Sequence, residues 1–156
     1  MKIILITLFF LLTHITAVNA VNVLPTYSTV YDESRDSFKD SLSAIKVAKE
    51  TNKNVLMIVG GNWCSFCKKM DDFIKDSPKV AEKLYNNFVV LKINYSDEYK
   101  NDEFLKHLPP ISSYPHIYIS TSSGKMVFSN NTLNLQENSY HTEKKWLDFI
   151  EHWQPK

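Results

Sequence analysis

The chain has 156 residues, of which 44% are hydrophobic and 22% charged, with 18 Lys and Arg against 17 Asp and Glu. This composition is typical of one globular domain with enough apolar residues for a core. The balanced charge excludes the basic surface that nucleic-acid-binding proteins need, and three glycines and six prolines exclude a collagen-like or low-complexity chain.

The first 20 residues have the pattern of a secretory signal peptide. Lys2 gives a positive start, residues 3–12 are apolar apart from one Thr, and the segment ends at the small residue Ala20. The apolar run is shorter than the roughly 20 residues of a membrane span. We therefore expect cleavage after Ala20, a periplasmic or secreted protein, and no membrane attachment afterwards. Because Lys2 is the only charged residue removed, the mature chain has zero formal net charge, and we expect no nucleic-acid partner.

Residues 21–35 are polar and irregular, and we interpret them as an N-terminal extension of a domain over residues 36–156. From Asp36 or Ser37 to Asn52, apolar residues recur at three- and four-residue steps and predict a helix. The expected apolar face of this helix contains Phe38, Leu42, Ile45 and Ala48.

The middle of the chain predicts two buried strands with two helices between them. The strands are the continuous apolar runs at residues 54–59 and 88–93. One helix is expected to begin at the cysteine pair that follows the first strand. The other is capped at Ser77, with Pro78 in its first turn.

The last third predicts a helix, a hairpin and a final helix. Residues 97–107 are polar with a few apolar positions and are expected to be helical. Residues 117–120 and 125–128 predict antiparallel strands joined by a Ser-Ser-Gly turn, and Thr142 caps the last helix. Such alternation of helices and strands predicts an α/β layer sandwich with a mixed sheet.

Cys64 and Cys67 are three residues apart and directly follow the first predicted strand. A disulfide that closes so short a loop contributes little to stability, so we interpret the two cysteines as a reactive pair rather than a structural disulfide. At a helix start, free backbone N–H groups and the helix dipole favour a thiolate. We expect Cys64 to be the exposed attacking sulfur and Cys67 the more buried sulfur that resolves the mixed disulfide. Trp63 is expected at the rim of the site, beside the attacking sulfur of Cys64, where it offers apolar surface to an incoming peptide.

The segment Trp63-Cys64-Ser65-Phe66-Cys67-Lys68 resembles the active site of the thioredoxin superfamily. The predicted element order agrees over residues 36–153, and the helix broken at Ser77-Pro78 resembles the secreted branch that includes the C-terminal domain of the bacterial transmembrane disulfide reductase. The resemblance implies a thioredoxin-like three-layer sandwich and a monomeric protein disulfide oxidoreductase. It implies exchange with protein thiols and disulfides and with an upstream redox partner. It also implies a redox-active Cys64–Cys67 disulfide and no other cofactor.

The thioredoxin superfamily also has a loop in which a cis proline faces the cysteine pair. Tyr114-Pro115, just before a predicted strand, matches this loop in position. The resemblance implies a cis bond there and a backbone at Tyr114 that pairs with a substrate strand. Cytosolic thioredoxins have a buried aspartate in the strand before the motif, whereas residues 54–59 contain no acid. A water or a carboxylate from elsewhere is expected to assist proton transfer at Cys67.

A Cys-x-x-Cys pair can also bind a soft metal. Zinc needs further ligands, and the sequence has no second pair and no histidine at motif spacing, so no zinc site is predicted. A Cu(I) carrier needs only two sulfurs. The alternative function is therefore a copper metallochaperone that uses Cys64 and Cys67.

Overall fold

The computed structural model describes residues 25–156, so the predicted signal peptide lies outside the described residues. At its centre is a four-stranded sheet in the order β2-β1-β3-β4. Strand β1 pairs parallel with β2 and antiparallel with β3, and β3 pairs antiparallel with β4. The mixed sheet predicted from the sequence is confirmed. The strands are β1 (Asn54–Gly60), β2 (Phe88–Asn94), β3 (His116–Ser120) and β4 (Met126–Asn131).

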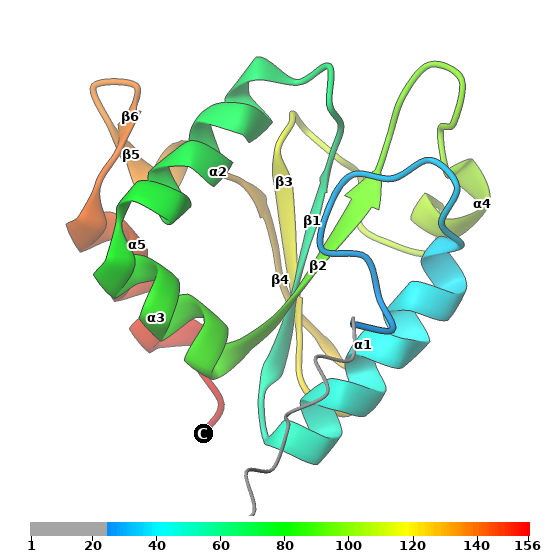
Figure 1. The fold of residues 1–156 in the computed structure, drawn as a ribbon, viewed down its shortest axis with the longest axis horizontal. Helices are drawn as coiled ribbons and strands as arrows, with labels where there is room; N and C mark the ends of the chain where they lie inside the picture. Colours follow the sequence, from blue (N-terminus) through cyan, green and yellow to red (C-terminus); the bar gives the residue numbers. More distant parts are fainter. Residues whose placement is uncertain (1–24) are drawn as a thin grey trace, which may run out of the picture.

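Helices cover both faces of this sheet (Figure 1). On one side lie α1 (Ser37–Thr51) and the short α4 (Asp102–Leu105). On the other lie α2 (Ser65–Asp76), α3 (Pro78–Asn87) and α5 (Glu143–Trp153). The three-layer α/β sandwich is therefore confirmed. None of the helices within residues 25–156 is long and apolar enough to cross a lipid bilayer.

Strand β1 explains why the core has two halves. Its side chains alternate between the faces of the sheet, as the pleat requires. Leu56 and Ile58 belong to the cluster beneath α2, α3 and α5, whereas Val55, Met57 and Val59 belong to the cluster beneath α1. Every residue of β1 is buried. A strand covered on both faces needs a continuous apolar run, which is the pattern that predicts it.

The face that helix α1 buries agrees only in part with the predicted one, because Ala48 is buried and Ile45 packs against the core but the two other predicted residues lie outside. Phe38 and Leu42 are 47% and 69% exposed. The buried residues of the helix are Ser37, Asp40, Ala44 and Ala48. Asp40 forms an ion pair with Arg35 and accepts the backbone N–H of Ser28, so its carboxylate is satisfied inside the protein. Small residues and a paired acid therefore face the sheet, and two larger apolar side chains lie outside.

The predicted helix over residues 97–107 is wrong except for one turn. Only Asp102–Leu105 is helical. Its buried side chain is that of Phe104, and the polar residues before it supply no apolar stripe to dock a longer helix. Asn101 sits in the left-handed region with φ of 52°, and its side chain donates a hydrogen bond to the carbonyl of Asn94.

A small hairpin between β4 and α5 is not predicted by the sequence. It comprises a 3-10 turn, η1 (Leu133–Leu135), and the strands β5 (Gln136–Glu137) and β6 (Tyr140–His141). Two residues per strand are too few for an alternating pattern to be recognised. The hairpin is fixed to the core by buried Leu135 and by the ring of His141, which lies 5.6 Å from that of Phe73.

The N-terminal extension runs beside the sheet before α1 begins. The backbone N–H of Lys92, on β2, donates a hydrogen bond of 2.9 Å to the carbonyl of Ser28. Three residues later Tyr31 enters the core. Its carbonyl accepts a 3.2 Å hydrogen bond from the side-chain amide of Asn62, in the loop before the cysteine pair. The extension thus reaches the region where the sequence places the active site.

Candidate active site

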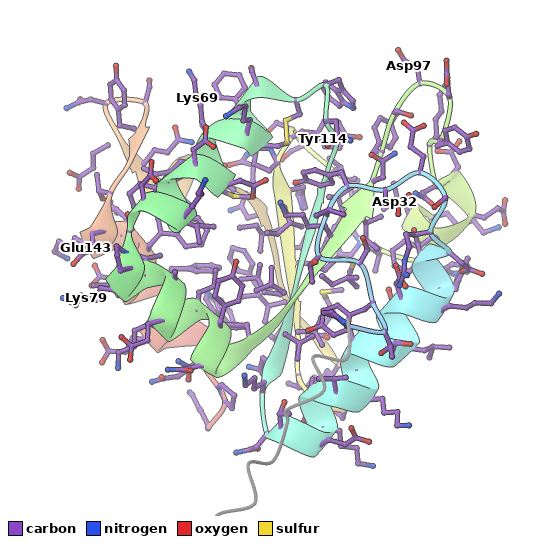
Figure 2. All side chains as sticks on the ribbon, in the orientation of Figure 1. Asp32, Lys69, Lys79, Asp97, Tyr114 and Glu143 are labelled. Atoms are coloured by element: carbon purple, nitrogen blue, oxygen red, sulfur yellow. A yellow bond between two sulfur atoms is a disulfide. The ribbon has the colours of Figure 1, made fainter. Side chains whose placement is uncertain are left out.

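Cys64 and Cys67 are joined by a disulfide, with their Cα atoms 5.2 Å apart. Figure 2 shows this bond in yellow at the end of α2, next to the labelled Tyr114. Cys64 is the N-cap residue of α2, with extended backbone angles, and its sulfur accepts the backbone N–H of Cys67 at 3.1 Å. The sulfur therefore occupies the place where a helix offers unpaired N–H groups and positive potential, which favours a thiolate after reduction.

The expected exposure of Cys64 is wrong for the oxidised protein. Cys64 is 4% exposed and Cys67 is 1% exposed, so both sulfurs are buried, with Cys67 the deeper. Both cysteines belong to the core cluster beneath α2, and the side chain of Tyr114 packs against that cluster. The sequence pattern correctly predicts that Cys67 is buried more deeply than Cys64. It does not predict that residues distant in sequence also bury Cys64.

An aromatic cluster of Trp63, Tyr95 and Tyr114 lies beside the disulfide. The indole Nε1 of Trp63 donates a 2.6 Å hydrogen bond to the carbonyl of Tyr95. The ring of Tyr114 stacks on Tyr95 at 5.0 Å and meets Trp63 edge-to-face at 5.5 Å. Trp63 is still 57% exposed, which agrees with its expected place at the rim. Burial, and then a hydrogen bond with Tyr95, raise the pKa of the Tyr114 phenol, so Tyr114 keeps its proton at neutral pH.

The peptide bond between Tyr114 and Pro115 is cis, as the resemblance implies. It directly precedes β3, in which His116 is paired with Val59 near the end of β1. The antiparallel pairing brings the loop to the end of the sheet from which the cysteine segment departs. The structure thus gathers Cys64, Cys67, Trp63 and Tyr114 at one end of the sheet, with Pro115 next in the chain.

Gly60 leaves room for the side chains of both Cys67 and Tyr31. A Cβ atom on this residue would lie 2.6 Å from the sulfur of Cys67 and 2.8 Å from the hydroxyl oxygen of Tyr31. Real side chains do not fit at such distances, so glycine is required at this position. Sequence reasoning missed Tyr31 because it lies in a polar, irregular stretch outside the expected domain, and no periodicity marks it.

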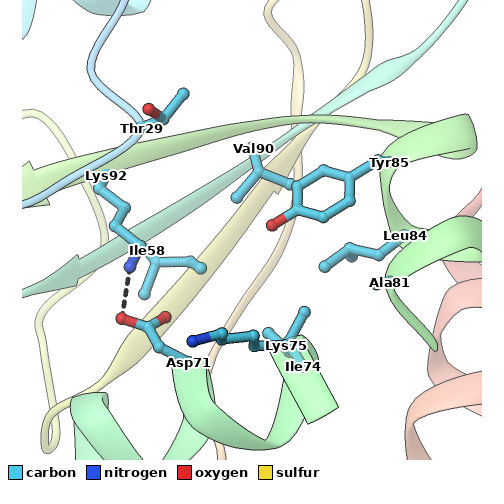
Figure 3. A pocket seen from close by; sticks show the side chains of 10 residues that line it. All are labelled: Thr29, Ile58, Asp71, Ile74, Lys75, Ala81, Leu84, Tyr85, Val90 and Lys92. Atoms are coloured by element: carbon cyan, nitrogen blue, oxygen red, sulfur yellow. Dashed lines mark hydrogen bonds and ion pairs between the residues drawn. The ribbon is translucent and has the colours of Figure 1, made fainter. Parts of the chain in front are cut away.

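Lys92 and Asp71 form a partly buried ion pair on the same side of the sheet, with 2.5 Å between nitrogen and oxygen. The Lys92 nitrogen also lies 4.7 Å from the ring centre of Tyr31. Both charged residues line a cavity of about 340 Å³ between the sheet, α2 and α3, where Figure 3 shows the pair directed toward one another. Asp71 is therefore a candidate for the carboxylate that the strand before the motif does not supply.

Metal binding has little support in this arrangement. Among residues 25–156, no group of three or more His, Cys, Asp and Glu side chains is placed to hold a metal ion. Cys64 and Cys67 are bonded to each other. No observation favours the Cu(I) carrier over disulfide exchange.

Comparison with known proteins identifies the fold and the family. A disulphide isomerase from Xylella fastidiosa Temecula1 is 25% identical, with a TM-score of 0.68 over 78% of this chain and 94% of that chain. Two solved structures share the fold at lower identity. The oxidised C-terminal domain of DsbD from Neisseria meningitidis is 18% identical, with a TM-score of 0.56 over 76% of this chain and 97% of that chain. The germline-specific thioredoxin Deadhead from Drosophila melanogaster is 21% identical, with a TM-score of 0.54 over 80% and 97%.

No curated protein sequence matches this chain. A family model described as a thioredoxin-like domain matches residues 42–132, which is more than half of the chain. That match includes the disulfide at the start of α2 and the loop with the cis proline. A Cys-x-x-Cys disulfide on this fold is that of a thiol–disulfide oxidoreductase. The chain therefore belongs to the thioredoxin-like domain family.

Proposed function

We propose that this protein exchanges disulfides with protein substrates through Cys64 and Cys67. The observation that carries the proposal is the position of Cys64 at the N-cap of α2, with its sulfur facing the backbone N–H of Cys67. A sulfur stabilised as a thiolate is present in its reactive form near neutral pH, and it also leaves readily from a mixed disulfide.

The proposed reaction balances without any further reactant. In the direction of substrate reduction, the Cys64 thiolate attacks one sulfur of the substrate disulfide and the other substrate sulfur leaves as a thiolate. The Cys67 thiolate then attacks the Cys64 sulfur, which forms the Cys64–Cys67 bond and releases the second substrate thiolate. Two electrons pass to the substrate, and solvent supplies the two protons that its thiols bind. The same steps in reverse oxidise a substrate.

The aromatic cluster and its loop are the proposed substrate surface. The exposed ring of Trp63 offers apolar area beside the disulfide. We propose that the backbone of Tyr114, held before Pro115, pairs with an extended substrate segment by β-addition. Tyr114 also packs against the cluster that contains both cysteines, so a peptide bound here lies next to the sulfurs.

Two cysteine variants test this function. Replacing Cys64 by Ser is expected to abolish insulin reduction with dithiothreitol as the electron donor, because the attacking sulfur is lost. Replacing Cys67 by Ser, the same chemical change one helical turn later, is expected to trap substrates as mixed disulfides on Cys64. Undiminished turnover in Cys64→Ser would overturn the proposal, and trapping on Cys67 in Cys64→Ser would reverse the two roles.

The direction of exchange follows from the reduction potential. Equilibration with glutathione buffers measures it directly. A potential near that of thioredoxin, about −270 mV, makes the protein a reductase, and one near about −120 mV makes it an oxidase. An intermediate value near about −180 mV fits an isomerase, like the Xylella disulphide isomerase, and refolding of a scrambled disulfide protein then checks it.

We also propose that the protein is exported and works in an oxidising compartment. The support is the apolar run of residues 3–12 followed by Ala20. Cell fractionation of the full chain, with N-terminal sequencing of the product, tests this. The expected product begins at Val21, and an uncleaved chain in the cytosol contradicts the proposal.

A further inference from the structure

Tyr31 buries a hydroxyl group that has no partner. The side chain is only 8% exposed, and its oxygen forms no hydrogen bond with any residue among 25–156. Burying a hydroxyl without a partner is unfavourable by about 1–3 kcal/mol, whereas a phenylalanine of the same shape avoids this cost. A state of the protein in which this hydroxyl is hydrogen-bonded would remove that cost.

The reacting sulfur of Cys67 is the group placed to be that partner. The Cys67 sulfur and the Tyr31 hydroxyl oxygen both lie next to Gly60, where a Cβ would be 2.6 Å from the sulfur and 2.8 Å from the oxygen, and no hydrogen bond joins the two atoms in the oxidised protein. In the oxidised protein this sulfur is bonded to Cys64 and is a weak acceptor. After reduction it is a thiol or a thiolate, and a thiolate accepts hydrogen bonds far more strongly.

We propose that Tyr31 donates a hydrogen bond to the sulfur of Cys67 when the disulfide is reduced, and thereby stabilises the resolving thiolate. This inference rests on the proposed disulfide exchange for its role, because Cys67 must be a thiolate to attack the mixed disulfide. When the Cys67 thiol ionises it releases one proton to solvent, and Tyr31 retains its own proton. No electron is transferred to or from the phenol.

The surroundings of Tyr31 favour the protonated phenol, which can donate a hydrogen bond, over the phenolate, which could act as a base. Burial first, and then the negative charge of Asp71 on α2, raise the pKa of the phenol far above its ordinary value. The hydroxyl therefore keeps its proton at every physiological pH. Lys92 of β2 lies over the ring face and is paired with Asp71, and β1 contributes no charged residue to this site. Asp71 and Lys92 also line the cavity drawn in Figure 3, whose lining includes neither Tyr31 nor Cys67.

The titration of Cys67 tests the proposal without any assay of activity. In a Cys64→Ser background, the thiolate absorbance of Cys67 is followed at about 240 nm against pH, with Tyr31 and with Tyr31→Phe. Losing a hydrogen bond to a charged group is expected to lower the acid dissociation constant at least about tenfold, which moves the midpoint up by about one pH unit. Tyr27→Phe is the matched control, because Tyr27 packs in the other core cluster, and it is expected to leave the midpoint unchanged.

Stability in the two redox states gives a second readout that needs no thiol titration. Tyr31→Phe is expected to leave the oxidised protein as stable as the unchanged chain, or more stable, and to destabilise the reduced protein relative to it. An unchanged Cys67 midpoint, or an equal change in the stability of both redox states, would overturn the proposal. If Cys64→Ser retains insulin reduction while Tyr31→Phe moves the Cys67 midpoint, the hydrogen bond stands and only the proposed function fails.

Discussion

The indole nitrogen of Trp63 is tied to the backbone carbonyl of Tyr95 by a hydrogen bond of 2.6 Å. This bond fixes the residue before Cys64 to the loop after β2 while more than half of the indole stays in solvent. A ring held in place in the free protein loses little conformational entropy when a partner covers it. Trp63 is therefore suited to bind a peptide beside the sulfurs.

Removing this ring is expected to affect protein substrates more than small ones. Trp63→Ala should lower kcat/KM for insulin about tenfold, because exposed aromatic anchors contribute more than about 1 kcal/mol to such contacts. Trp63→Phe keeps a ring but loses the hydrogen bond, so its kcat/KM for insulin should lie between those of the unchanged chain and of Trp63→Ala. Exchange with glutathione should change less than about twofold. Leu42→Ala, an equally exposed apolar residue on α1, is the control, and an equal loss there would contradict this role.

Gly61 leaves the space that the hydrogen bond between Trp63 and the Tyr95 carbonyl needs. A Cβ at this position would lie 2.5 Å from the Trp63 nitrogen and 2.6 Å from the Tyr95 carbonyl oxygen. Gly61→Ala should therefore displace the indole and lower the free energy of unfolding by about 1–3 kcal/mol. Urea denaturation and insulin reduction measure the two effects.

Gly124→Ala is the comparison for Gly61→Ala. Gly124 has φ of +83°, so alanine is strained there, but the nearest side-chain atom is 3.4 Å away and the residue lies in the β3–β4 turn. This variant should lose stability while insulin reduction by the folded fraction is retained. Full activity in Gly61→Ala would show that the position of the indole is unimportant.

The ion pair between partly exposed Arg35 and buried Asp40 should contribute to the stability of the N-terminal extension. Asp40→Ala leaves the buried Ser28 N–H without its acceptor and removes the partner of the guanidinium, and we expect a loss of about 1–3 kcal/mol on urea denaturation. Hydrogen exchange at the Lys92 amide should also accelerate, since its acceptor is Ser28. Asp148→Ala, which breaks an exposed pair with Lys144, should have no measurable effect. Equal losses in the two variants would contradict this assignment.

Stability should decrease as the pH falls below about 6.5 because of His141. Its Nδ1 is placed to accept the indole N–H of Trp146 at 3.1 Å, and burial lowers its pKa below the ordinary value of 6.5. The folded protein thus favours neutral imidazole and the unfolded chain binds the proton more readily. Unfolding is therefore favoured in acid, by at most about 1.4 kcal/mol per pH unit for one group.

An asparagine at position 141 tests this titration, because its amide oxygen can replace Nδ1 as the acceptor. Urea denaturation at about pH 7.5 and 5.5 should show a smaller acid loss in His141→Asn than in the unchanged chain. Burial also lowers the pKa of His116, so the double variant with His116→Gln should show a smaller loss still. An unchanged acid loss in both variants would exclude these histidines as its cause.

Most of the fold can be predicted from the sequence where pattern and burial coincide. Both buried strands of the parallel pair are continuous apolar runs, and the caps at Asp36 and Thr142 begin α1 and α5 as expected. The prediction fails where polar pairing decides the outcome. On α1 the buried face contains Asp40, which is paired with Arg35, while Leu42 lies outside, and no periodicity in the sequence marks such a pair.

The residues of the candidate site also fall into those that the sequence predicts and those that it does not. Cys64 and Cys67 can be recognised from their spacing and Tyr114 from its place before a proline and a strand. The neighbours that act on them come from segments with no pattern of their own. Tyr31 and Cys67 both lie next to Gly60, which has no side chain to displace them, and Tyr95 receives the Trp63 hydrogen bond through its backbone. Contacts of these kinds depend on tertiary placement rather than on local composition.

The hydrogen bond between Lys92 and Ser28 has a further consequence for how copies of the chain meet. Strand β2 is at the border of the sheet, where unpaired backbone groups can recruit a strand from another molecule. The extension occupies part of that border with its own backbone. A chain shortened to begin after Ser28 would lose this bond and present more of the border of β2 to its neighbours, so we expect it to aggregate edge to edge more readily than the full chain.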